Sequence, residues 1–517
     1  MSEGKQAIVS TKSGKLEGDY QNGIYVFKGI PYTAAPVGNL RWMPPQPVTS
    51  WSGVRPAKQY GAIAPQNLMA APSDSPGIPS FGDQPQSEDC LFLNVWTPGL
   101  DDARRPVMFW IHGGAFIIGS GSEAFLEGGK LAKRGDIVLV SINYRLGALG
   151  FMHLNEITAG KIPATGNEGL LDQVAALEWV QDNIATFGGN PDNITVFGFS
   201  AGGMSIGTLL AMSAARGKFQ KAINRSGAAN IISTLDSANE ITNQFLNIFG
   251  LKGNDADGLR NLTTQQVLDG QQQLSLKLRE TEYRATPFQP IVDGTIITET
   301  PMISIKNGSA KNVALMAGNS RDELKAMNAM DPAMNNLDEA GMIKRLNTML
   351  PSDLVSGLVQ TYRNALQQRG NVVTPVEILG SINTDMMFRI PTIRLVEAQR
   401  DNGAPAYNYL FTYRSPAMGG VLGAMHGLDN PFLFGSLDAE FTGNSPDVEK
   451  LAAKIQDSCT AFTHTGDPSC ENTGPWPVYG ENRMTMIFDI NTRIETAPFE
   501  VERKAWDSYD LLSTTPI

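Results

Sequence analysis

A serine flanked by glycines, Ser200 in the stretch TVFGFSAGG, is the residue whose surroundings point most directly to covalent chemistry. β-branched residues precede it, and a run of small residues follows it. A serine hydroxyl is a weak nucleophile at neutral pH, so it needs a general base and a site that stabilises a developing oxyanion. The motif G-x-S-x-G is short, and it indicates a nucleophile only between a strand and a helix. A loop serine that merely has glycine neighbours is the alternative.

The stretch IHGGAF, residues 111–116, supplies a candidate oxyanion site. It follows an apolar run, as expected of a strand that bends sharply into a loop of small residues. Loops of this kind aim backbone N–H groups at a developing negative charge. The N–H groups of Gly114 and Ala115, with that of Ala201 after the serine, would make three donors. A glycine turn without a chemical role is the alternative.

Four histidines are available as the general base. His426 lies in GAMHGLDNPFLFG, a Gly-rich stretch before an aromatic segment, where a histidine has the mobility and access that a core histidine lacks. His112 lies in the glycine loop, which we expect it to support. We expect His153 and His464 to be satisfied residues at the surface or at an edge. His426 is therefore the favoured base, with an inert loop histidine as the alternative.

The acid that orients such a base lies between the serine and the histidine along the chain. An apolar run at residues 312–318 predicts a buried strand and leads directly into NSRDEL. Carboxylates directly after a strand belong at the catalytic edge of a sheet. Asp322 and Glu323 both satisfy this condition, and the chemistry does not choose between them.

The elements that must position these residues alternate between strands and helices. Residues 7–32 carry apolar side chains with a period of two, which predicts paired strands at the start. Residues 166–189 have helical spacing, and residues 193–199 predict the strand before Ser200. Further strands are predicted at residues 90–98, 106–114, 136–145, 222–226, 312–318, 407–414 and 483–490. The alternation implies an α/β protein with a largely parallel sheet, whose carboxyl edge is capped by the helix-rich stretch from about 230 to 480.

The composition of the chain excludes several functional classes. The formal net charge is −11, which argues against nucleic-acid binding because phosphates are bound by clustered Lys and Arg. No apolar run approaches the roughly 18 residues of a membrane helix.

The start MSEGKQAIVS has no apolar signal core, so we expect a cytoplasmic protein, with export after removal of a leader as the alternative. The absence of CxxC and HExxH motifs disfavours zinc, and Cys459 and Cys470 could pair only in an oxidising compartment.

Several long motifs follow one another along nearly the whole chain: FKGIPYTAAPVGNLRW, SEDCLFLNVW, HGGAF, GNEGLLDQVAALEWVQDNIATFGGNPDNITVFGFSAGG, NSRDEL and HGLDNPFLFG. In these motifs the chain resembles the type-B carboxylesterases, which include cholinesterases and bacterial p-nitrobenzyl esterases. The resemblance implies an α/β-hydrolase fold with a large, mostly parallel central sheet, helices on both faces, a small N-terminal antiparallel sheet and helical cap insertions. We expect residues 1–517 to form a single domain, with the cap insertions roughly within 230–480.

The resemblance also implies the roles of the candidate residues. The family places the acid at the end of a G-x-x-x-D-E segment, which matches Gly318 to Glu323, so Glu323 is the expected acid. Ser226, in the stretch RSG, is expected to support this acid. No cofactor or metal is expected. The full expected site comprises Ser200, Glu323 and His426 as the triad, Gly114, Ala115 and Ala201 as oxyanion donors, and Ser226 behind the acid.

Three departures from the family pattern bear on function. Ala64 stands where many exported relatives carry a cysteine that pairs with the cysteine of the EDCL segment, so Cys90 lacks that partner. Asp429 stands where relatives usually carry Glu. Residues 65–89 contain no tryptophan, whereas choline-specific relatives place one there to hold a quaternary ammonium, so choline esters are disfavoured.

We therefore expect a serine carboxylesterase that hydrolyses uncharged esters of short to medium acyl chain through an acyl-enzyme, with water as the second substrate. The same triad acting on carbamates or amides, or as an acyltransferase, is an alternative, as is a non-catalytic binding protein. Phe116, the Met-rich residues 326–336 and residues 432–435 suggest an apolar gorge, with ordinary core packing as the alternative. We expect a monomer or a small homo-oligomer.

Overall fold

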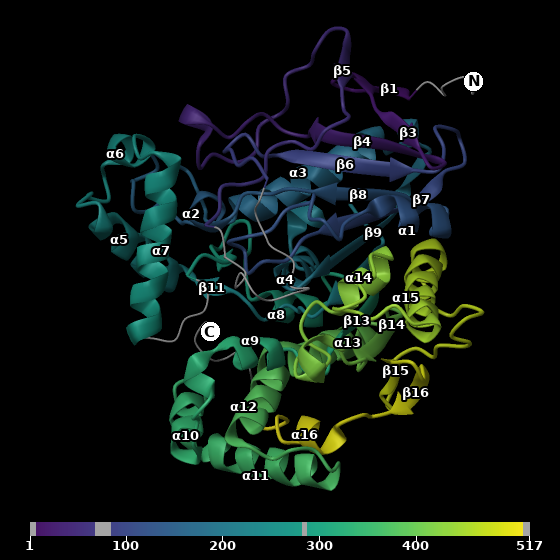
Figure 1. The fold of residues 1–517 in the computed structure, drawn as a ribbon. Helices are drawn as coiled ribbons and strands as arrows, with labels where there is room; N and C mark the ends of the chain where they lie inside the picture. Colours follow the sequence, from purple (N-terminus) through teal and green to yellow (C-terminus); the bar gives the residue numbers. More distant parts are fainter. Residues whose placement is uncertain (1–6, 68–83, 282–286, 510–517) are drawn as a thin grey trace.

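The computed structural model describes residues 7–67, 84–281 and 287–509 (Figure 1). They are built around an 11-stranded sheet. Every neighbouring pair from β8 to β15 is parallel, whereas β16 at one edge and β6, β4 and β3 at the other edge pair antiparallel. The mostly parallel α/β sheet is therefore confirmed. The strands in spatial order are β16 (Arg493–Thr496), β15 (Met484–Phe488), β14 (Ala406–Phe411), β13 (Ala314–Ser320), β10 (Lys221–Arg225), β9 (Gly189–Phe199), β7 (Arg105–Ile111), β8 (Val138–Ile142), β6 (Phe92–Thr97), β4 (Ile24–Pro31) and β3 (Asp19–Gln21).

The small N-terminal sheet differs from the prediction in one detail. β1 (Ile8–Thr11) and β2 (Gly14–Glu17) form the predicted antiparallel pair, but β5 (Val54–Pro56) adds to β2 in parallel. The long segment between β2 and β5 allows the chain to return in the same direction, which a parallel pair requires. The other early strands, β3 and β4, extend the large sheet instead.

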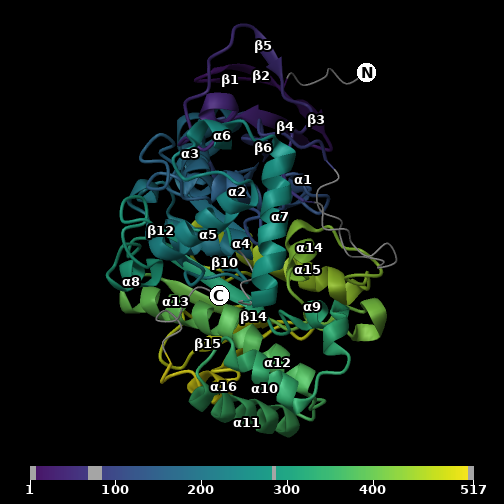
Figure 2. The same ribbon diagram turned by 90° about the vertical axis from the view of Figure 1, so that its left-hand side faces the viewer.

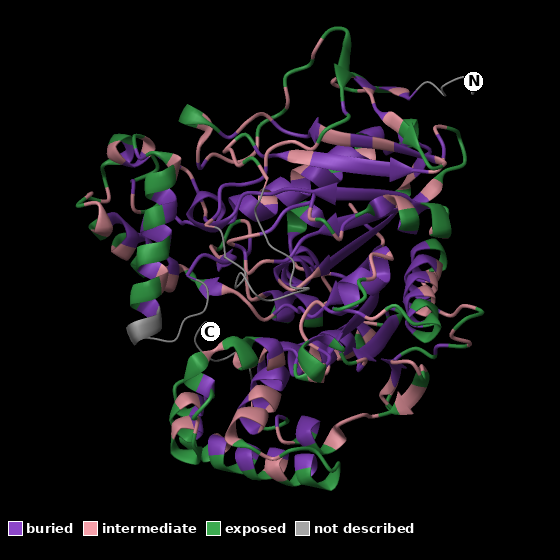
Figure 3. Cartoon of the chain, viewed as in Figure 1, coloured by how far each residue is buried: buried purple, intermediate pink, exposed green. Residues whose placement is uncertain are grey.

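Side chains of the parallel strands point alternately into two cores, because both faces of the sheet are covered. Phe109 of β7 belongs to the core on one face of the sheet, and Trp110 belongs to the core on the opposite face. Figure 3 shows the buried residues concentrated in and around the sheet. The helices that contribute to the first core include α3 (Glu168–Asn183), α4 (Ala201–Leu209) and α13 (Ile390–Asp401), and those that contribute to the second include α1 (Gly128–Gly135), α14 (Asp429–Phe434) and α15 (Pro446–Thr465).

Two further groups of helices lie beyond the sheet (Figures 1 and 2). One comprises α5 (Leu235–Ile248), α6 (Ala256–Arg260) and α7 (Thr264–Thr281). The other comprises α9 (Lys325–Met330), α10 (Glu339–Asn347), α11 (Ser352–Gln368) and α12 (Pro375–Thr384), and it contains a separate core that includes Trp506, just after α16 (Glu500–Lys504). α12 continues through a π-helical turn, η5 (Asp385–Arg389), into α13. None of the described helices is both long and apolar enough to cross a membrane.

Candidate active site

Ser200 lies on the turn between β9 and α4, which is the strand–turn–helix context that the motif requires. Its backbone has φ 57° and ψ −125°, a strained conformation for a residue with a side chain. A Cβ on Gly202 would lie 2.0 Å from the carbonyl oxygen of Ile111, and one on Gly198 would lie 2.7 Å from the carbonyl carbon of Gly202. Small residues on both sides of Ser200 are therefore a packing requirement. Ser200 itself is only partly buried.

The glycine loop after β7 packs directly against this turn. A Cβ on Gly113 would lie 3.0 Å from the Cβ of Ser200. Gly114 and Ala115 have positive φ, at 107° and 54°, so the chain bends sharply here. Within the described residues, no hydrogen bond engages the N–H groups of Gly114, Ala115 or Ala201. As far as the described residues are concerned, these three N–H groups are available to bind an anion.

Glu323 and His426 form a hydrogen-bonded pair although they come from distant parts of the chain. The imidazole Nδ1 of His426 lies 2.5 Å from Oε2 of Glu323, and the backbone N–H of His426 donates to the carbonyl of Glu323 at 3.3 Å. Glu323 is fully buried, and its Oε1 accepts the backbone N–H of Ser320 at 2.7 Å. With a carboxylate as the acceptor at Nδ1, that nitrogen carries the proton and Nε2 is left as the basic nitrogen.

Asp322 has a different role from its neighbour. Its carboxylate accepts the N–H of Ala424 at 2.8 Å, and the N–H of Asp322 donates to the carbonyl of Ala424 at 3.0 Å. Burial opposes ionisation of Asp322, but the hydrogen bonds and the positive charge of Arg321 bring its pKa below the ordinary value. The structure thus separates the two carboxylates. Glu323 contacts His426. Asp322 fastens the loop that carries His426, residues 421–428, which we call the histidine loop.

His112 supports the glycine loop, as expected. Its buried ring stacks on Tyr144 with ring centroids 4.3 Å apart, and its Nδ1 donates to the carbonyl of Gly113 at 2.7 Å. Burial lowers the pKa of His112 to about 4, against the opposing effect of that bond. The ring is therefore neutral at pH 7 and holds its loop without carrying charge.

The two remaining histidines have structural partners. His464 is exposed, as predicted, and its Nε2 donates to the carbonyl of Gly135 at 2.8 Å. His153 is buried rather than at the surface, so that part of the prediction is wrong. The reason is that α5 packs over it, with Nδ1 of His153 2.8 Å from Oδ1 of Asn239 on that helix.

Ser226 makes no hydrogen bond to Glu323. Its N–H donates to the carbonyl of Gly318 at 2.8 Å, and its fully buried hydroxyl has no hydrogen-bond partner among the described residues. The backbone of Ser320 occupies Oε1 of Glu323 instead. A buried hydroxyl without a protein partner is the kind of group that binds an ordered water. The supporting role of Ser226 therefore stays a prediction.

The structure adds a buried ion pair that sequence reasoning missed. Nη2 of Arg225, at the end of β10, lies 2.6 Å from Oδ2 of Asp429, and both side chains are 2% exposed. Burial works against the charge of Arg225, but Asp429 keeps its pKa above the ordinary value. Asp429 begins α14 just after the histidine loop, so the pair ties that loop to the sheet. The sequence offered one signal for this ion pair, which is that two opposite charges lie near candidate site residues. Arg225 directly precedes Ser226, and Asp429 lies three positions after His426.

Residues expected to line a gorge belong partly to the core. Phe116 and residues 432–434 are fully buried, so the core-packing interpretation holds for them. In the Met-rich segment, Met327 and Met330 are exposed, whereas Met334 is buried. All three cysteines are free. Residues 68–83, most of the segment noted for its lack of tryptophan, lie outside the described residues.

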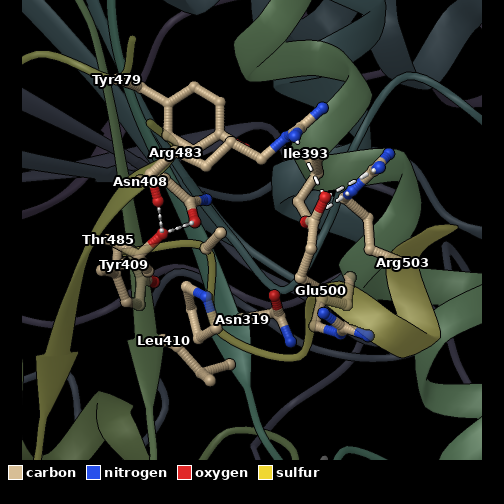
Figure 4. A pocket seen from close by; sticks show the side chains of 13 residues that line it. Asn319, Ile393, Asn408, Tyr409, Leu410, Tyr479, Arg483, Thr485, Glu500 and Arg503 are labelled. Carbon is tan, nitrogen blue, oxygen red and sulfur yellow. Dashed lines mark hydrogen bonds and ion pairs between the residues drawn. The ribbon is translucent and has the colours of Figure 1, made fainter. Parts of the chain in front are cut away.

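Cavities elsewhere in the described part of the chain include the two that follow. One, of about 250 Å³, borders Asp322 between α9 and α12. The other, of about 20 Å³, is drawn in Figure 4, where Glu500 lies between Arg483 and Arg503 and bonds both. That cavity has room for about one water. Ser200 lines neither of them, so the geometry of Ser200, Glu323 and His426, rather than a cavity, locates the candidate site.

Comparison with known proteins decides the family. The model of the carboxylesterase family matches residues 5–506. The chain belongs to the carboxylesterase family. It is 38% identical over 509 residues to the para-nitrobenzyl esterase of Bacillus subtilis, which covers 96% of this chain and 98% of that protein. It is 34% identical over 482 residues to the phenmedipham hydrolase of Pseudarthrobacter oxydans, with 91% and 92% covered.

Solved structures agree with this membership. A carboxylesterase from Geobacillus stearothermophilus superposes with a TM-score of 0.85 at 34% identity, covering 97% of this chain and 100% of that one. A structure of PNB esterase gives a TM-score of 0.85 at 36% identity, with the same coverage. This carboxylesterase therefore has the α/β-hydrolase fold and is a carboxylic ester hydrolase, as the motifs predicted, and a non-catalytic binding protein is not favoured.

Proposed function

We propose that Ser200 is the nucleophile of this carboxylesterase and that Glu323 and His426 complete its triad. The observation that carries the proposal is the bond from Nδ1 of His426 to Glu323 at 2.5 Å, because it leaves Nε2 as the base. The ring of Phe199, which directly precedes the nucleophile, lies 4.4 Å from the imidazole centroid. The base and the serine turn are therefore in contact.

The proposed reaction has two halves that use the same groups. Nε2 of His426 takes the proton of the Ser200 hydroxyl as Oγ attacks the ester carbonyl carbon. The oxyanion accepts hydrogen bonds from the N–H groups of Gly114, Ala115 and Ala201. Collapse expels the alcohol with the proton from His426 and leaves an acyl group on Ser200. Water that loses a proton to Nε2 then attacks the acyl carbon, and the acid is released.

We propose uncharged esters of short to medium acyl chain as the substrates. The ring of Phe199, which is only partly buried, lies against the imidazole and favours an apolar substrate beside it. The relative from Bacillus subtilis is named for para-nitrobenzyl esters. The cytoplasmic location and a monomer or small homo-oligomer stay predictions.

A panel of p-nitrophenyl esters, from acetate to palmitate, tests the proposal with wild type and Ser200→Ala side by side. We expect wild type to turn over the short esters fastest and Ser200→Ala to fall to the background rate. Faster turnover of the long-chain esters would contradict the proposed acyl preference. Equal activity of the two proteins would remove Ser200 from the mechanism.

A further inference from the structure

The imidazole of His426 contacts two phenyl rings. The ring of Phe199 is 4.4 Å from it, centroid to centroid, at an interplanar angle of 44°, and that of Phe388 is 4.9 Å away at 47°. Phe199 adjoins Ser200 and is fixed with the nucleophile. Phe388 comes from a different part of the fold. Together with the bond to Glu323, these contacts leave the imidazole little freedom to rotate.

Phe388 lies on the π-helical turn η5, between α12 and α13. A π-helical turn inserts an extra residue into a helix and so changes the direction in which its side chains point, and such turns are frequent at functional sites. Phe388 is 3% exposed, so its ring lies in the protein interior. The carbonyl of the adjacent Met387 accepts Nδ2 of Asn230 at 3.3 Å, which fixes the turn against the segment after β10.

A buried polar network holds this turn from its far side. Asp385 and Arg389, at the two ends of η5, are paired, with Nε of Arg389 2.6 Å from Oδ1 of Asp385. The hydroxyl of Tyr362 on α11 donates to the other oxygen of Asp385. Nε1–H of Trp506 donates to the Tyr362 oxygen at 2.8 Å. All four side chains are buried, so breaking one bond leaves a polar group without a partner.

We propose that Phe388 is a positioning residue for His426 and that the network of Trp506, Tyr362 and Asp385 sets its place through the π-helical turn. The ring limits rotation of the imidazole about its bond to Glu323 and keeps Nε2 directed at the serine. The helical group α10–α12 and the chain after α16 thereby contribute to the alignment of the base. The proposal rests on the proposed function of His426.

Phe388→Leu tests the first step, with Phe245→Leu as the matched control. Phe245 is an equally buried phenylalanine on α5 that packs with Phe249 and Phe288. We expect Phe388→Leu to lower kcat by about tenfold with KM nearly unchanged, because small misplacement of a reacting group is costly. We also expect it to broaden the downfield proton resonance of the Nδ1–H of His426. Phe245→Leu should change neither quantity.

The proposal is overturned if Phe388→Leu leaves kcat and the proton resonance as in wild type. It is also overturned if both variants lower kcat in proportion to their losses in thermal stability, because Phe388 would then be a core residue only. The resonance is read without any ester. It therefore tests the position of the imidazole even if Ser200 proves not to be the nucleophile.

Tyr362→Phe tests the second step, because it removes only the hydroxyl that Asp385 accepts. We expect kcat to fall about threefold in the wild-type background and to show no further fall when combined with Phe388→Leu, as a double-mutant cycle would report for coupled residues. If Tyr362→Phe and Phe388→Leu lower kcat independently of each other, the network does not act through Phe388 and this step of the proposal is overturned. If Phe388→Leu does not fold, Tyr362→Phe and the resonance of His426 decide the matter.

Discussion

The two halves of the site are built in opposite ways. The serine half is local, because residues 198–203 contain the strained turn and the glycines that make room for it. The histidine half is assembled from distant segments: Glu323 bonds the imidazole, Asp322 fastens the histidine loop, and the pair of Arg225 and Asp429 ties that loop to the sheet. The geometry around Ser200 is thus a property of its own motif. The geometry around His426 depends on side chains that are far away in the sequence.

The largest effect is expected when the histidine half loses its proposed acid. Glu323→Gln replaces the carboxylate by an amide that cannot stabilise the imidazolium and can bond the wrong tautomer, so we expect kcat to fall by about 10⁴-fold. Hydrolysis of p-nitrophenyl acetate at saturation measures this. Asp322→Asn is the neighbouring control and should keep most of the activity. A Glu323→Gln enzyme within tenfold of wild type would contradict the assignment of the acid.

Gly202→Ala is expected to distort the turn that carries Ser200. Its Cβ would meet the Ile111 carbonyl oxygen at 2.0 Å, and both atoms belong to rigid elements, so α4 must shift. We expect the free energy of unfolding to fall by about 1–3 kcal/mol and kcat to fall by about 10²-fold. Urea unfolding and steady-state kinetics measure the two quantities. Gly357→Ala is the matched control, because this glycine is also helical but has open space around it, and its substitution should stabilise the protein slightly.

Asp429→Asn weakens the histidine half from a distance, because it leaves Arg225 buried without its counter-charge. We expect the free energy of unfolding to fall by about 3–5 kcal/mol and kcat to fall by about tenfold as the histidine loop loosens. Asp447→Asn breaks an exposed pair with Lys450 and should cost at most about 1 kcal/mol. Replacing both members of the buried pair, in Arg225→Met with Asp429→Leu, should restore stability but not kcat. Restored kcat in that double variant would show that the pair does not position the loop.

The smallest effect is expected from Asp322→Asn, and it depends on pH. The pKa of Asp322 is lower in the folded protein than its ordinary value of 3.8, so the carboxylate stabilises the fold above that value. Its contribution is lost as the pH falls through the lowered pKa. Wild type should therefore be more stable than Asp322→Asn at pH 7, and the difference should disappear in stronger acid. Urea unfolding over a pH series measures it, and a difference that persists at the lowest pH argues against ionisation as the cause.

The sequence predicts what is encoded locally. Local patterns predicted the apolar strands β7 and β8, the strand before Ser200 and the Gly-rich turn. Each of these elements depends on neighbours within a few positions. The choice between Asp322 and Glu323 was not readable from the chemistry, because it depends on which one faces His426 in space. The burial of His153 likewise results from packing against α5, which no local pattern reports.

The π-helical turn and the pair of Arg225 and Asp429 were missed for the same physical reason. A π turn has no residue signature that distinguishes it from α-helix, and its effect is only seen in the contact of Phe388 with His426. Arg225 and Asp429 lie 204 positions apart, so their charges have meaning only once β10 and α14 are packed together. The parallel addition of β5 to β2 similarly depends on the path of the intervening chain.

Labelling with a fluorophosphonate, followed by mass spectrometry of the digested protein, identifies the serine that acts as the nucleophile. This reagent phosphonylates only a serine that is activated by a base. We predict stoichiometric modification of the peptide that contains Ser200 in wild type, and a loss of most of the labelling rate in Glu323→Gln and His426→Gln. Modification at another residue, or labelling of Ser200 at the wild-type rate in both variants, would contradict the triad.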